Sequence, residues 1–500
     1  MAFERIFTDD ELDHLATPLS IHVERAAKAR EATGLPWVID QMNQECLGIY
    51  DAYVSWMGVL QSYIVERAGE GAHDMALTWV AEYGTRPFVR SWAGLDARGR
   101  ALKLAERLRA SGSTFDVSED ERRVRFTLDP WGPVRWWRQS DTAGQSWEGP
   151  AAVRADRLRY PCYGHYDPPV SFAVLSGGRP LTHGRDELPS FLATEIQFLE
   201  SVPIELFGYP IAAIELGERA DDPSHLDVYK DPADVPSEVY ARAGLSKPVL
   251  GSGSRDDHGR LFTEEELSRM GTPLSLQVQQ AAGADDHAAL LEISAGMDTE
   301  LVGAKDPVGV TIAGLLSWIA WHFGEVAAEE ALARTAEVVM APFLSAVRDL
   351  TIKEAIPAWC VAWRSHGSTF WMDEHEETVI LRGRPLGACH RMLSHAYQPR
   401  VERISESRVR YPTFGCYDAP ASMHLMREPR GITHGKTRYP IYSCHCHMLH
   451  EIYPIDQVGH PLWVEEHNID DWDGEMIHTH YKDPSAWPAR YYEQVGRSKP

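Results

Sequence analysis

One segment of this chain concentrates side chains that bind metals or transfer protons. Residues 444–480 contain two cysteines, seven histidines and eight carboxylates. Thiolate and imidazole are the preferred ligands of zinc and of several iron and copper sites. We therefore expect a metal site here, with these candidate ligands: Cys444, His445, Cys446, His447, His450, His478 and His480.

The spacing at the start of this segment predicts how many ligands can converge. If residues 444–451 form a helix, His447 shares a face with Glu451, and Cys446 shares a face with His450. If the segment is a strand instead, alternate residues share a face. Either geometry presents two or three ligands to one ion.

Two later stretches carry further candidates. Residues 465–467 read Glu-Glu-His, and His478 and His480 alternate as they would on one face of a strand. The meeting of three stretches predicts one metal ion per chain, zinc or iron, with copper as a further option. If the ion is zinc, either Glu451 or Glu466 could then serve as a general base.

The chain contains one unit twice. IFTDDELDHLATPLS from Ile6 matches LFTEEELSRMGTPLS from Leu261, and YKDP recurs at Tyr229 and Tyr481. Residues 249–260 are rich in Gly, Ser and charge, as flexible linkers are. The sequence therefore predicts a first repeat at 1–248, a linker at 249–260 and a second repeat at 261–500.

Each unit is expected to be α+β, with an N-terminal helical segment followed by mostly antiparallel strands. Thr8 with Glu11, and Thr263 with Glu266, match the capping box that begins a helix. Apolar residues at three- to four-residue spacing predict one or two helices across 308–347. Strands are expected where β-branched residues alternate or cluster, at 122–128, 378–383 and 461–467.

Comparison of the two units separates what the fold needs from what one unit alone possesses. In the alignment of the two units, the first five metal candidates correspond to residues of other types in the first unit: Ala193, Thr194, Glu195, Ile196 and Leu199. Cys389 also lacks a cysteine counterpart, which makes it a catalytic candidate. His434 is a further catalytic candidate, but its counterpart His183 lies in the same Thr-His-Gly turn, so a structural role is the alternative. The first unit is thus expected to be structural.

The bulk composition excludes several classes of function. A net charge of -24 repels phosphate backbones and anionic membranes, so neither nucleic acid nor a membrane is an expected partner. The chain begins without a signal-peptide pattern and has no apolar run of about 18 residues, which favours a cytoplasmic protein. The sequence contains no glycine-rich phosphate loop, so no nucleotide cofactor is expected. The fused units could replace an ancestral dimer, and a homo-oligomer stays possible.

Four elements of the second unit carry a resemblance to a known family: Cys446, Gly459-His460-Pro461, Val464-Glu465-Glu466 and 478–480. Their order resembles that of 4-vinyl-reductase domains, although histidines stand where that family has its late cysteines. The resemblance covers only the last part of each unit. It implies a zinc ion beside a pocket for an aromatic or tetrapyrrole-like molecule.

These features predict a metal-dependent enzyme acting on a small organic molecule, aromatic ones included. Two alternatives stay open. The protein could bind or sense a small molecule around a structural metal, which four protein ligands would saturate. It could also be a metal-free hydrolase or lyase in which an imidazole activates the thiolate of Cys444 or Cys446. Histidines in such a cluster can also be solvated surface residues or satisfied core residues.

Overall fold

The computed structural model describes thirteen stretches of the chain. They are residues 5–92, 94–110, 113, 115–128, 174–175, 188–217, 223–249, 259–347, 350–365, 368–385, 425–437, 439–467 and 476–500. The fold is α+β, as predicted, with long helices and two four-stranded antiparallel sheets. None of the helices in these stretches combines the length and the apolar character that a bilayer crossing requires.

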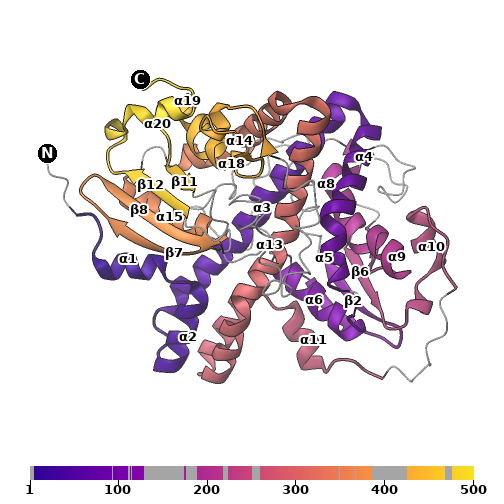
Figure 1. The fold of residues 1–500 in the computed structure, drawn as a ribbon. Coiled ribbons are helices and arrows are strands. Elements are labelled where there is room, and N and C mark those ends of the chain that lie inside the picture. Colours follow the sequence, from indigo (N-terminus) through magenta and orange to yellow (C-terminus); the bar gives the residue numbers. More distant parts are fainter. Residues whose placement is uncertain are drawn as a thin grey trace, which may run out of the picture.

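Two sets of helices form the middle of the molecule. The first set is α1 (Asp9–Ala16), α2 (Leu19–Ala29), α3 (Leu35–Ala68), α4 (Glu70–Val80), the π-helix η1 (Ala81–Thr85), α5 (Arg86–Arg90) and α6 (Ala97–Ala110). The second set is α11 (Glu264–Gly271), α12 (Leu274–Gly283), α13 (His287–Phe323), α14 (Glu325–Val347) and α15 (Ile352–Ser365). The long helices α3 and α13 pack against each other and run through the centre (Figure 1).

The helix starts and breaks follow local sequence signals. Both predicted capping boxes are confirmed, at Thr8 with Glu11 and at Thr263 with Glu266. The predicted run across 308–347 divides into α13 and α14 at Gly324. This glycine has a φ of 91°, in the left-handed region that residues with a Cβ rarely adopt.

Each half of the chain builds one sheet, and the two sheets have the same strand order. The first sheet is β1 (Phe115–Glu119), β2 (Arg123–Leu128), β6 (Ser224–Tyr229) and β5 (Ala213–Glu215). The second is β7 (Ser368–Glu374), β8 (Thr378–Pro385), β12 (Met476–Tyr481) and β11 (Val464–His467). Within the described stretches two short pairs are also present, β3 (Val174–Leu175) with β4 (Leu188–Pro189) and β9 (Leu425–Met426) with β10 (Tyr439–Pro440).

A broken helix precedes the last strands of each half. In the first half it consists of α8 (Ser190–Ile196), the π-helix η3 (Gln197–Ser201) and α9 (Val202–Phe207). In the second half it consists of α18 (Cys444–His447), the π-helix η9 (Met448–Ile452) and α19 (Tyr453–Val458). The other short elements of the described residues are η4 (Pro232–Asp234), α10 (Ser237–Arg242), η8 (Gly431–Thr433), η10 (Pro484–Ala486) and α20 (Ala489–Gln494). Because both halves have a π-helix at this point, it belongs to the shared fold.

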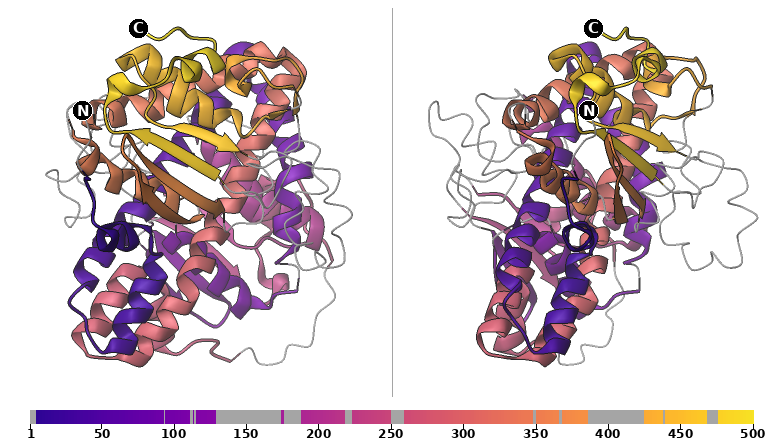
Figure 2. Two further views of the ribbon diagram at one scale, coloured as in Figure 1. Left: turned by 60° about the vertical axis from the view of Figure 1, so that its left-hand side comes forward. Right: turned by 90° about the vertical axis from the view of Figure 1, so that its left-hand side faces the viewer.

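The first helix of each half packs against the sheet of the other half. Helix α1 contacts β7, where Glu374 accepts hydrogen bonds from the amides of Ile6 (2.6 Å) and Phe7 (2.8 Å). Helix α11 contacts β1, where Glu119 accepts in the same way from Leu261 and Phe262, at 2.6 and 3.0 Å. Figure 2 shows α1 beside the orange sheet that lies far from it in the sequence.

The two halves also share a hydrophobic core. One continuous cluster of buried side chains includes residues from Phe7 to Val495, and a second cluster joins α2 and α3 to α12 and α13. The predicted division at 249–260 therefore falls between halves that pack into each other rather than side by side. Residues 250–258 of that expected linker lie outside the described stretches.

Acid should weaken the attachment of α1 to β7. Burial alone would raise the pKa of Glu374, but Lys482, at 2.6 Å, and the two amides lower it below its usual range. A lowered folded-state pKa stabilises the fold above the ordinary glutamate pKa of about 4.3, and this contribution is lost as the pH falls through the folded value. We expect the free energy of urea unfolding to fall less between pH 7 and pH 3 in Glu374→Gln than in the wild type.

Glu376→Gln is the matched control for that measurement, because Glu376 is exposed in the turn after β7. It should keep the pH dependence of the wild type. Equal pH dependence in the wild type and Glu374→Gln would show that the contact contributes nothing to stability.

Candidate metal centre

The helix α18 and the π-helix η9 carry the first predicted ligands. The helical alternative is the one observed: His447 contacts Glu451 four residues later, and Cys446 lies in one group with His450. Because the two pairs are one residue apart, they occupy adjacent faces of the helix. The structure therefore divides the predicted ligands between two groups rather than one.

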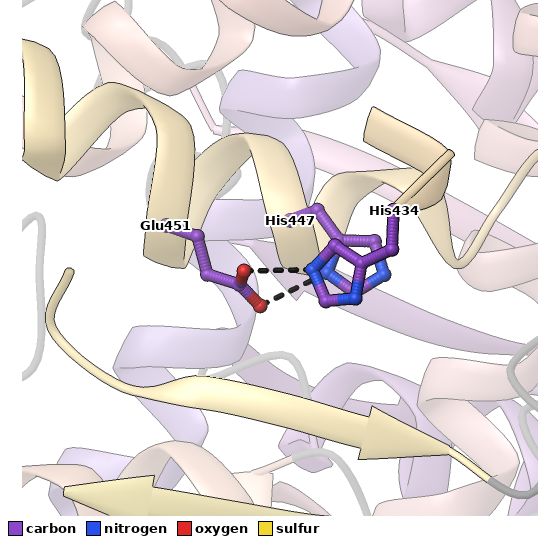
Figure 3. A group of neighbouring side chains, drawn as sticks. All are labelled: His434, His447 and Glu451. Atoms are coloured by element: carbon purple, nitrogen blue, oxygen red, sulfur yellow. Dashed lines mark hydrogen bonds and ion pairs between the residues drawn. The ribbon is translucent and has the colours of Figure 1, made fainter. Parts of the chain in front are cut away.

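The first group, which we call the His–Glu group, consists of His434, His447 and Glu451 (Figure 3). His434 Nε2 lies 2.8 Å from one oxygen of Glu451, and His447 Nδ1 lies 2.9 Å from the other. The two imidazole rings are 3.5 Å apart between centroids. Tyr439 Oη lies 2.7 Å from the remaining nitrogen of His447, which fixes the orientation of that ring.

Glu451 is an ionised carboxylate at the centre of this group. Burial alone would raise its pKa, but His447 and His434 outweigh burial and lower the pKa to about 2. The backbone amide of Glu465 also donates to Glu451, at 3.1 Å. The carboxylate therefore orients two imidazoles and connects η9 to β11.

The second group, which we call the Cys–His–Glu group, consists of Cys446, His450 and Glu465. One sulfur, one nitrogen and one oxygen atom lie within 4.8 Å of one another, and all three residues are buried. His478 lies opposite Glu465 in the β11–β12 pair, and its Nε2 is 3.2 Å from the Glu465 carboxylate. Two strands and a helix thus meet at this group, as the sequence predicted.

The donors of the Cys–His–Glu group are in a low-polarity environment. Burial raises the pKa of Cys446 well above that of an ordinary thiol, and the Glu465 carboxylate adds to this effect. Burial lowers the pKa of His450 well below its usual range, so its imidazole is neutral. Within the described part of the chain, Nδ1 of His450 has no hydrogen-bond partner. A neutral imidazole with a bare nitrogen is the form that binds a metal.

Four predicted ligands lie outside the two groups: His478, which contacts Glu465, and Cys444, His445 and His480. Cys444 is buried, and burial together with Glu325 and Glu329 raises the pKa of its thiol well above the usual value. His445 donates from Nδ1 to the carbonyl of Tyr442, while its Nε2 lies 3.4 Å from the sulfur of Cys446.

The ring of His480 stacks on Trp359 at 4.0 Å between centroids. It shares the buried face of β12 with His478, as the alternate spacing predicted. Cys389 lies outside the described residues.

A cavity of about 250 Å³ is lined by two residues of the His–Glu group and by Glu465 of the Cys–His–Glu group. Its lining consists of His434, Lys436, Tyr439, His447, Glu465, Glu466 and Gln494. Glu466, a predicted general base, is therefore at the cavity, and Glu465 reaches it from the Cys–His–Glu group. Sequence reasoning missed Lys436, Tyr439 and Gln494. The repeat offers a signal for Gln494, because the offset that aligns YKDP places it opposite Arg242 of the first half.

The corresponding region of the first half contains ion pairs where the second half has candidate metal ligands. Glu195 faces Cys446 in the repeat and binds Arg107 at 2.7 and 2.9 Å. Glu200 faces Glu451, and Arg242 lies 3.3 Å from its carboxylate. Ile214 faces Glu465, and its amide donates to Glu200 just as the amide of Glu465 donates to Glu451. The carboxylate that connects helix and strand is thus common to both halves.

The fold and these groups define a mixed helix-and-sheet protein with buried candidate metal ligands. No protein-family model matches the sequence, and neither a curated protein nor a solved structure matches it. The resemblance to 4-vinyl-reductase domains therefore stays a prediction.

Proposed function

We propose that this protein is a metal-dependent enzyme whose second half binds zinc or iron through Cys446, His450 and Glu465. The ion would act on a small molecule held in the adjacent cavity. One observation carries the proposal: sulfur, nitrogen and oxygen donors converge within 4.8 Å in a buried site that adjoins a cavity through Glu465.

The donor set fits a catalytic ion better than a structural one. Thiolate, imidazole and carboxylate are all ligands of zinc, and catalytic zinc sites have three protein ligands and one open position. His478 contacts the Glu465 carboxylate and would orient it, as partners of ligands commonly do. The bound ion would supply a Lewis acid or an activated water at the open position.

The metal-free alternative has less support from the surroundings of Cys446. A thiol nucleophile requires an accessible thiolate at neutral pH. Burial and Glu465 both raise the pKa of Cys446, so the thiol keeps its proton unless a cation replaces it. A metal ion supplies that cation and releases the proton.

The cavity supports a polar substrate over a purely aromatic one. Its lining includes Lys436, Glu466 and Gln494, which offer a cation, an anion and an amide. Its volume of about 250 Å³ is slightly below the range of about 300–1,000 Å³ that is usual for small-molecule sites. Glu466 is the better placed general base, because Glu451 already accepts hydrogen bonds from two imidazoles and one amide.

The first half would then stabilise the second. The repeated strand order and the reciprocal contacts of α1 and α11 support a duplicated unit whose two copies fold together. In the first copy, Glu195 stands at the position of Cys446 and pairs with Arg107, where the second copy would bind the ion.

Cobalt substitution of the full chain tests the proposal. We expect the purified protein to contain zinc or iron, and the cobalt(II) form to show the intense near-ultraviolet absorption of a sulfur–cobalt bond. Acetohydroxamate should change the visible spectrum by entering the open position, whereas a site saturated by protein ligands would not respond. Failure to retain metal or to bind added cobalt would overturn the proposal, and a spectrum insensitive to acetohydroxamate would favour a structural metal in a binding protein.

A further inference from the structure

We propose that the His–Glu group binds a second divalent cation, so that two ions flank the cavity. This inference rests on the metal site proposed above, but a different set of residues carries it. The cavity is lined by His434 and His447 from one group and by Glu465 from the other, so both ions would reach the same bound molecule.

The geometry of the His–Glu group is that of a site with three converging donors. His434 Nε2 and His447 Nδ1 approach different oxygens of one carboxylate, at 2.8 and 2.9 Å. The other nitrogen of His447 contacts Tyr439 Oη at 2.7 Å. A metal-bound histidine generally donates its second ring N–H to an oxygen acceptor, and Tyr439 is placed to accept it. The Glu465 amide fixes the carboxylate from behind.

The charge of the group points to a cation. In the first half, Arg242 lies 3.3 Å from Glu200 and compensates that buried carboxylate. In the second half, the residue opposite Arg242 is Gln494, which lines the cavity. The contacts recorded for Glu451 within the described part of the chain come from two imidazoles and an amide, and none from a lysine or arginine.

Replacement of an arginine by glutamine therefore leaves a buried anion beside two imidazoles and an open cavity. Burial of a carboxylate with no arginine beside it is costly, and a bound cation would reduce that cost. Two imidazoles and a carboxylate suit zinc, iron(II) or manganese(II), whereas the neighbouring thiolate favours zinc or iron. Two ions on one cavity would together stabilise oxygen anions that form on a bound substrate.

The number of zinc ions bound per chain tests the second site independently of the proposed function. Chelator-stripped full-length protein would be titrated with zinc chloride, and bound zinc measured after removal of the free ion. We expect about two ions per chain in the wild type, and about one in Gln494→Arg, whose guanidinium would take the place of the second ion. Gln494→Met, which adds no charge, should keep both ions.

His434→Asn is a second variant that adds no bulk, and it should also bind about one ion. Cys446→Ala should retain the second ion and lose the first. Thermal unfolding of each variant checks that the fold persists. One ion in the wild type, lost in Cys446→Ala and kept in Gln494→Arg and His434→Asn, would overturn the second site and leave the proposed function intact. No bound ion in the wild type would overturn both.

Discussion

Cys446→Ala should weaken zinc binding at the Cys–His–Glu group, whereas Cys444→Ala should leave it unchanged. The two cysteines are two residues apart, and both are buried in the same helix. Only Cys446 places its sulfur beside His450 and Glu465. A structural zinc site with four ligands is worth about 10–16 kcal/mol, so one ligand contributes roughly 3 kcal/mol and its loss should weaken binding on the order of 100-fold.

Competition with a chromogenic zinc chelator measures this difference. Cys444→Ala removes a thiol of the same size and burial, so it controls for the cavity that either substitution leaves. Equal zinc affinity in the two variants would show that Cys446 is not a ligand. A larger loss in Cys444→Ala would place the site on the other side of the helix, toward Glu325 and Glu329.

Glu45→Ala should destabilise the protein by about 3–5 kcal/mol, the largest stability change that we expect. Glu45, on α3, forms a buried ion pair with Arg364, on α15. The same guanidinium donates to the carbonyl of Leu15 and to Gln41, both at 2.8 Å. Removal of the carboxylate takes the ion-pair partner from a buried guanidinium between the two halves. Urea unfolding at neutral pH measures the loss.

Two further variants serve as controls for the stability change in Glu45→Ala. Glu66→Ala removes the partner of Arg334 from another pair between the halves, but both side chains are about half exposed, so the cost should stay below about 1 kcal/mol. Glu45→Leu combined with Arg364→Met replaces both charges by apolar groups and should recover most of the stability. A small effect of Glu45→Ala would show that the halves are held together mainly by their shared apolar core.

The pairings at the site could be predicted wherever a single element fixes them. The helical alternative for residues 444–451 places His447 against Glu451 and Cys446 beside His450, and the structure has both arrangements. The strand alternation that places His478 and His480 on one buried face is also confirmed. These relations depend only on the period of a helix or strand.

Relations that depend on tertiary packing could not be predicted. Nothing local indicates that α1 would pack against β7 instead of its own sheet, because the exchange depends on Glu374 more than 360 residues away. Likewise, Cys444 and Cys446 are both thiols, and only the orientation of α18 relative to β11 determines that Cys446 rather than Cys444 lies beside Glu465. His434 belongs to a Thr-His-Gly motif whose sequence recurs at Thr182, so the sequence comparison favoured a structural role for it.

The sequence contains a signal for Gln494, namely the difference between arginine in the first unit and glutamine in the second, but this difference can be interpreted only once the fold is known. The repeat aligns it with Arg242, yet the exchange of arginine for glutamine gains meaning only when Arg242 is seen beside Glu200. Tyr439 gave no signal, because a tyrosine near a cysteine and histidine cluster is equally expected in a core.

X-ray absorption at the zinc edge tests the central claim most directly. The full chain would be loaded with one equivalent of zinc, which should enter the Cys–His–Glu group first because that group has the thiolate. We expect one sulfur neighbour at about 2.3 Å together with nitrogen and oxygen neighbours at about 2.0–2.2 Å, and loss of the sulfur in Cys446→Ala. A spectrum with no sulfur, or with two sulfurs, would contradict a site built from Cys446, His450 and Glu465.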